Sequence, residues 1–194
     1  MSKTGTLLLI VSLLYFSCSE SGGTSERTNI EKGDSIQFFQ LKQYIESEIQ
    51  EIDKTPFYIY KIEVTNGKKD STAINTAVLK ALSAPFAYAD ISKPSIKKNY
   101  KESVFHDQST ESYTISYSAI TPDLEVQNID VLLKEDGQTV KRLFIRKFIN
   151  YGDSTAMEQL SWKAGESFRI NRLVQMPNKS EIERQTVVVW NAKS

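Results

Sequence analysis

The feature that most constrains the fold of this chain is a change in the spacing of its apolar residues near Tyr100. Before this point apolar residues recur about every 3.6 residues, which is the period of an amphipathic helix, and after it they alternate with polar ones, which is the period of a half-buried strand. The alternating segments are 112–119, 124–134, 138–150, 155–163, 167–176 and 183–190. Short turns separate them, so we expect an antiparallel meander of at least five strands.

The segment before the meander predicts two helices and a hairpin. A helix is expected over 34–53, capped by Asp34 or Ser35, because its apolar residues share one face. A strand over 57–65 leads into Asn66-Gly67, a strong signal for a tight hairpin turn, and then into a weak return strand over 68–74. A second helix is expected over 76–88, where Pro85 kinks or splits it. Together these elements predict an α+β fold, with N-terminal helices packed on an antiparallel β-meander sheet.

The first residues have the pattern of an export signal. A short basic start is followed by the apolar run 7–16, and the small Ser17 stands at a cut point. Ten residues of helix span roughly 15 Å, about half the hydrocarbon core of a bilayer, which is too short for a permanent membrane span. We therefore expect residues 1–17 to be a signal peptide.

Cys18 refines this expectation. The run Leu14-Tyr15-Phe16-Ser17-Cys18 resembles the lipobox of bacterial lipoproteins, with Tyr15 where the family favours Leu. The resemblance implies that the Cys18 sulfur carries a diacylglycerol, that the signal is cut before it, and that the new amino group is acylated, for instance by palmitate. Ser19 after the cysteine points by the same resemblance to the outer membrane. The alternative is an unmodified thiol just past an ordinary cleavage site.

The remaining chain reads as a tether and one domain. Residues 18–33 hold the expected lipid-bearing Cys18 and a Gly/Ser-rich stretch in which Ile30 is the one large apolar residue, so we expect a flexible tether there. Residues 34–194 carry no second linker and are expected to form a single domain. From about residue 34 to 190 the layout resembles small uncharacterised bacterial lipoproteins, a resemblance that implies no activity.

The composition excludes several kinds of chemistry. Lys and Arg total 24 against 24 Asp and Glu, a balance that argues against a nucleic-acid-binding protein. One His and one Cys cannot form a zinc site of the usual kind, and His106, expected in a loop between strands, is the one imidazole available for nucleophilic catalysis. The common phosphate-binding loops are missing too. We expect no enzyme, no metal and no cofactor, although carboxylate-only hydrolysis stays open.

One segment has a pattern suited to ligand binding. In the strand expected over 138–150, alternation places Arg142, Phe144, Arg146 and Phe148 on one face together with Val140. The opposite face carries Lys141, Leu143, Ile145, Lys147 and Ile149. Alternating Arg and Phe suit an anion or a stacked planar ligand, so these four residues are the candidate ligand site. The alternative is that the Arg stems cover the Phe rings on a solvent-facing surface.

These observations favour a lipid-anchored binding or scaffold module of the cell envelope. Its expected partners are the membrane, through the lipid on Cys18, and an envelope protein or a small ligand. Two alternatives stay open. One is a carboxylate-based hydrolase, and the other is an inhibitor or partner protein of an envelope complex, which predicts an exposed apolar patch.

Overall fold

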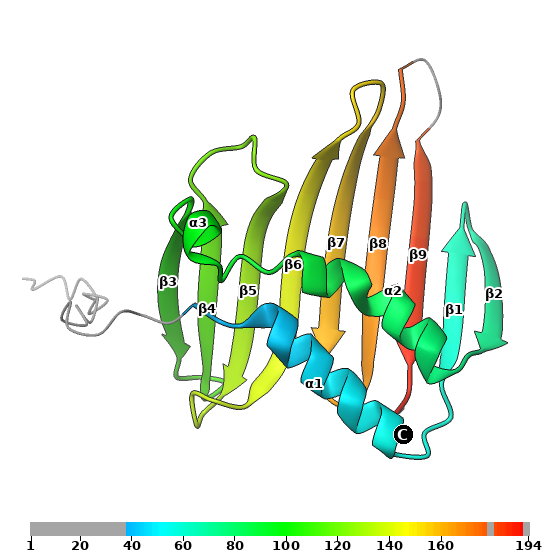
Figure 1. The fold of residues 1–194 in the computed structure, drawn as a ribbon, viewed down its shortest axis with the longest axis horizontal. Coiled ribbons are helices and arrows are strands. Elements are labelled where there is room, and N and C mark those ends of the chain that lie inside the picture. Colours follow the sequence, from blue (N-terminus) through cyan, green and yellow to red (C-terminus); the bar gives the residue numbers. More distant parts are fainter. Residues whose placement is uncertain (1–37, 178–180, 192–194) are drawn as a thin grey trace, which may run out of the picture. The chain divides into compact units, whose positions relative to one another are not determined.

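The computed structural model describes residues 38–177 and 181–191, and in this part of the chain nine strands form one antiparallel sheet (Figure 1). The helices are α1 (Leu41–Lys54), α2 (Thr76–Tyr88) and the short α3 (Pro94–Lys97). The strands are β1 (Tyr60–Thr65), β2 (Lys68–Ala73), β3 (Tyr100–Asp107), β4 (Ser112–Ala119), β5 (Val126–Lys134), β6 (Val140–Asn150), β7 (Thr155–Lys163), β8 (Ser167–Gln175) and β9 (Ile182–Val189). The expected signal peptide, Cys18 and the tether lie outside the described residues.

The sheet order is β2-β1-β9-β8-β7-β6-β5-β4-β3, so the expected meander is confirmed and runs from β3 to β9. The β1–β2 hairpin extends the same sheet, because β1 pairs with β9 from Tyr60↔Val189 onward. Asn66 and Gly67 connect the hairpin with φ values of 47° and 81°, the left-handed backbone that a tight two-residue turn requires. The hairpin was predicted, but its pairing with the last strand was not.

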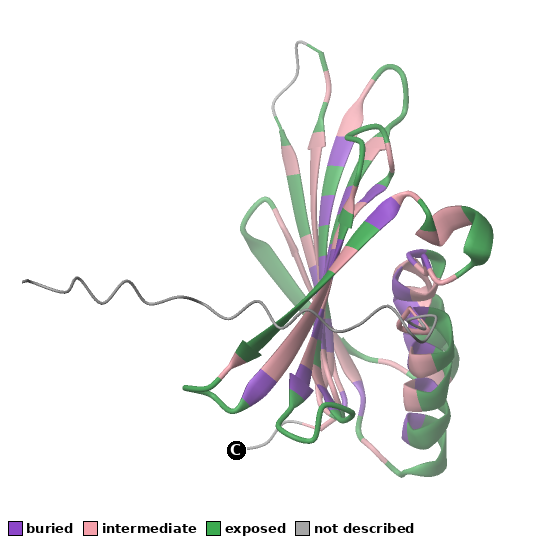
Figure 2. Cartoon of the chain, turned by 90° about the vertical axis from the view of Figure 1, so that its left-hand side faces the viewer, coloured by how far each residue is buried: buried purple, intermediate pink, exposed green. Residues whose placement is uncertain are grey.

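Helices α1 and α2 lie along one face of the sheet (Figure 2). Helix α1 buries the apolar stripe that its spacing predicts, namely Leu41, Ile45, Ile49 and Ile52. It begins at Leu41, after Gln40, and so starts later than residue 34, and the proposed caps Asp34 and Ser35 lie outside the described residues. Helix α2 has the predicted bounds and stays continuous through Pro85, which sits in its last turn.

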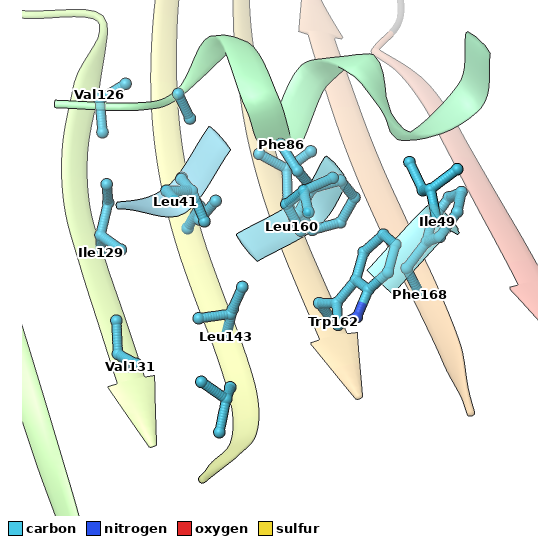
Figure 3. Close-up of a cluster of buried hydrophobic side chains, with 14 of the residues drawn as sticks. Leu41, Ile49, Phe86, Val126, Ile129, Val131, Leu143, Leu160, Trp162 and Phe168 are labelled. Carbon is cyan, nitrogen blue, oxygen red and sulfur yellow. The ribbon is translucent and has the colours of Figure 1, made fainter. Parts of the chain in front are cut away.

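Apolar side chains from α1, α2 and strands β5 to β8 meet in one core (Figure 3). At its centre the ring of Phe86 meets Trp162 edge-on at 5.3 Å, and Trp162 stacks on Phe168 at 5.2 Å. Glu48 of α1 accepts hydrogen bonds from Trp162 Nε1 (3.2 Å) and from the Gly165 backbone N–H (3.1 Å). These contacts attach α1 to the end of β7. Helices α1 and α2 together cover one face of the sheet and leave the other face open.

Within the described residues, no helix combines the length and the apolar character needed to cross a membrane.

Candidate functional site

The open face of the sheet, opposite α1 and α2, carries the candidate ligand residues of β6. Arg142, Phe144, Arg146 and Phe148 are all exposed and alternate with buried residues, so the predicted shared face is confirmed. Val140 was wrongly assigned to this face. Arg142 and Val140 pair with consecutive residues of β5, so Lys141 between them has no partner there. This irregularity turns the Val140 side chain toward the core. The ligand-binding role of the four residues stays a prediction.

The register of the sheet brings polar side chains from four other strands into line with Arg146 of β6. Residues paired directly across antiparallel strands point to the same face, and the pairs here connect each member to the next. We call this set the polar row, and its members are Asn128, Arg146, Gln159, Asn171 and Gln185. Within it, Gln185 Nε2 donates a hydrogen bond to Asn171 Oδ1 at 2.9 Å.

A second line of side chains runs beside the polar row. It consists of Asp130, Phe144, Ser161 and Arg169, again from directly paired positions, and we call it the aromatic row. The ring of Phe144 is 42% exposed. Residues of the two rows line a shallow groove of about 320 Å³, whose floor includes Ile145 and Leu160. The groove therefore offers amides, a hydroxyl and an accessible ring within one small area.

Charge in this groove is unbalanced. Its lining carries two guanidinium groups, Arg146 and Arg169, against one carboxylate, Asp130. Arg142, exposed two positions before Phe144, adds a third guanidinium next to the groove. Among the described residues none of these four groups takes part in a salt bridge. The groove is therefore suited to ligands that bring negative charge and hydrogen-bonding groups.

Two exposed apolar side chains flank the polar row on its other side. Phe148 and Met157 are directly paired across β6 and β7, and they are 43% and 41% exposed. They place an apolar border next to the groove on the same open face.

The helix-facing side of the sheet holds a charged cluster that sequence reasoning missed. Lys147 Nζ lies 2.7 Å from Glu125 Oε1 and 3.3 Å from Glu158 Oε2. Arg172 Nη1 lies 3.6 Å from Glu158 Oε1, and Arg172 Nη2 donates to the Tyr151 hydroxyl at 2.6 Å. The signal for this cluster was present, because alternation already put Lys147 on the same face as Leu143 and Ile145, where a cation needs a buried partner.

The charged cluster is built for ion pairing. Glu125 and Glu158 both engage Lys147, which differs from the pair of carboxyl groups flanking a substrate groove that glycoside hydrolysis uses. Burial raises the pKa of the nearby Tyr100 hydroxyl, and the charge of Glu125 raises it further. This tyrosine donates a hydrogen bond to the Val126 carbonyl at 2.9 Å. The cluster thus joins β6, β7 and β8 to Glu125, the residue that precedes β5.

His106 lies in strand β3, so its expected place in a loop was wrong. The residues around it are mostly exposed on both faces of an edge strand, which removes the apolar alternation that marks a strand in a sequence. Its ring stacks on Tyr113 with centroids 4.3 Å apart and planes 11° apart. This contact gives His106 a packing role within the sheet.

No group of three or more His, Cys, Asp or Glu side chains that could hold a metal ion occurs in residues 38–177 and 181–191. Comparisons with protein-family models, with curated proteins and with solved structures find no match to this chain.

Proposed function

We propose that this chain is a lipid-anchored binding module of the cell envelope and that its ligand occupies the groove on the open face. The observation that carries the proposal is that the polar row runs beside Phe144 on a face that α1 and α2 leave uncovered (Figure 2). Arg146 and Arg169 line the same groove, and neither is in a salt bridge with another described residue. Ligand sites are commonly formed by polar groups that converge around an accessible aromatic ring. The shallow groove fits a ligand that lies on the sheet.

Binding is better supported than hydrolysis by the arrangement of the acids. The groove contains one carboxylate, Asp130, whereas carboxylate-based hydrolysis uses two. The two acids that do meet, around Lys147, are committed to ion pairs on the helix-facing side. We therefore assign the open face a recognition role.

The anchor part of the proposal predicts that Cys18→Ala releases the protein from the membrane fraction. One acyl chain binds a bilayer only marginally and two or more hold firmly, so losing all of them removes the attachment. Fractionation and intact-mass measurement check this, with Ser19→Ala as a control that keeps the lipid. If Cys18→Ala stays as firmly bound as the parent, or if the native protein weighs no more than its bare chain, the lipid anchor is refuted.

The groove part of the proposal predicts selective photocrosslinking in native membranes. A photoreactive phenylalanine analogue at Met157, beside the polar row, should form an adduct with an envelope component. The same analogue at Tyr88, an 83% exposed residue of α2, should not. Mass spectrometry of the purified adduct measures the outcome. Equal adducts at both positions, or none at Met157, would count against a ligand site on the open face.

A partner protein is the second candidate function, and the exposed pair Phe148 and Met157 favours it. Such a pair is the kind of apolar contact that a protein interface buries. The photocrosslinking experiment separates the two candidates, because a protein adduct at Met157 is degraded by protease and a small-ligand adduct keeps a small, defined mass.

A further inference from the structure

We infer that the ligand of the groove is an acidic oligosaccharide whose chain runs across the strands, an inference that rests on the proposed function. The polar row crosses β5 to β9 at right angles to the strand direction. Neighbouring strands lie about 4.8 Å apart, which is close to the length that one pyranose ring contributes to a linear sugar chain. Successive rings can therefore meet successive side chains of the row.

The chemistry of the polar row matches sugar hydroxyls. Asn128, Gln159, Asn171 and Gln185 each present an amide with an acceptor oxygen and a donor NH₂ group. Adjacent ring hydroxyls of a sugar also donate and accept, so these amides can bond them. Asn128 Nδ2 already donates one hydrogen bond to the Tyr117 carbonyl, at 3.1 Å, and offers a ligand its second N–H and its oxygen. The hydrogen bond from Gln185 to Asn171 holds two of these amides in a fixed orientation before a ligand arrives. A simple inorganic anion accepts hydrogen bonds only and would leave the acceptor oxygens unused.

The aromatic row supplies the apolar contact that a sugar ring needs. One side of a pyranose ring presents mainly C–H groups, and these pack against the face of an aromatic ring. Phe144 is sufficiently exposed for this contact and lies directly between Asp130 and Ser161, whose oxygens can bond the hydroxyls at the ring's edge. Phe144 therefore sets the position of one sugar ring in the groove.

The arginines specify an acidic sugar. Arg146 and Arg169 line the groove with one opposing carboxylate, and Arg142 stands beside it. A guanidinium group binds a carboxylate through two parallel hydrogen bonds, which a neutral hydroxyl cannot reproduce. Because the groove lining has more positive than negative charge, a sugar that carries a carboxylate binds there more tightly than its neutral counterpart.

Other chain-like ligands fit these observations less well. An extended peptide that adds to a sheet pairs with the free backbone of an edge strand, whereas the groove lies over β5 to β8, in the interior of the sheet. Single-stranded nucleic acid is held by several stacking rings in a strongly basic channel, and the groove lining has one ring, Phe144, and a single excess positive charge.

The test is a calorimetric titration of the full lipidated protein in detergent micelles. The probes are a galacturonic acid tetramer, the corresponding neutral galactose tetramer and the galacturonic acid monomer. We expect the acidic tetramer to bind at least about tenfold more tightly than either of the others, since one charge-assisted hydrogen bond is worth roughly that factor. Added salt should weaken the acidic tetramer selectively.

Three variants locate the binding. Arg146→Gln should weaken the acidic tetramer about 10-fold to 100-fold and leave the neutral tetramer nearly unchanged. Phe144→Ala should weaken both tetramers. Arg184→Gln is the matched control, because Arg184 is also an exposed arginine of the sheet but lies on the helix-facing side, paired with Arg172, and it should change nothing.

Several results would overturn the inference. These are equal binding of the acidic and neutral tetramers, equal binding of tetramer and monomer, no binding of any probe, or tighter binding of an acidic peptide or an oligonucleotide of the same charge. The photocrosslinking at Met157 tests the proposed function separately. A small non-carbohydrate adduct there refutes the sugar and supports the groove, and a protein adduct refutes the sugar and favours the partner protein. The absence of any adduct refutes both the sugar and the groove.

Discussion

Ile45→Asp is expected to abolish the cooperative unfolding transition of this protein. Ile45 lies in the middle of the buried stripe of α1 and is only 1% exposed. The substitution removes a buried side chain worth about 1.5–3 kcal/mol and places a carboxylate in the apolar core. Since a domain of this size is stable by about 5–15 kcal/mol in total, the loss consumes most or all of the stability.

Thermal unfolding followed by near-ultraviolet circular dichroism measures this effect. Gln43→Asp is the matched control, because Gln43 is exposed on the same helix near its N-terminus, where a negative charge is tolerated or mildly favourable. We expect the control to melt within a few degrees of the parent. An Ile45→Asp protein that melts like the parent would show that this face of α1 carries little of the fold's stability.

The elements that could be predicted from the sequence are those with a strong local period. Helix α2 and strands β4 and β7 have the predicted bounds, because apolar periodicity and flanking turn residues both act over a few residues. Helix α1 begins later than predicted, since Phe38 fits the apolar stripe and packs against the core without being helical. Strand β3 was not predicted as a unit, because it is an edge strand whose residues are mostly exposed.

Pairing between strands distant in sequence could not be predicted. Nothing in the segment 57–65 indicates that β1 pairs with β9, because that pairing depends on where the meander ends in space. The candidate site shows the same division. The shared face of Arg142 and Phe144 follows from alternation within β6, whereas the alignment of Gln159 with Arg146 depends on the register between β6 and β7. The polar row thus became visible only in the folded sheet.

Lys147→Ala is expected to destabilise the protein by about 3–5 kcal/mol, because it breaks a buried ion pair and leaves a charge without its partner. The side chains of Lys147 and Glu158 are each only 8% exposed, and Lys147 also binds Glu125. After the substitution, Glu158 keeps only the 3.6 Å contact with Arg172, which is already shared with Tyr151. Chemical denaturation measures the loss as a lower midpoint at unchanged slope.

Further variants separate this effect from the simple loss of a lysine. Lys42→Ala removes a cation from an exposed pair with Glu46, at 3.8 Å, and should cost less than about 1 kcal/mol. The double variant Lys147→Met with Glu158→Gln removes both charges and keeps their bulk, so it should recover much of the stability that Lys147→Ala loses. If Lys147→Met alone recovers as much stability as the double variant, the penalty of Lys147→Ala comes from lost packing. A double variant that is more stable than Lys147→Met would identify the carboxylate of Glu158 as the cause, because that is the group the second substitution neutralises.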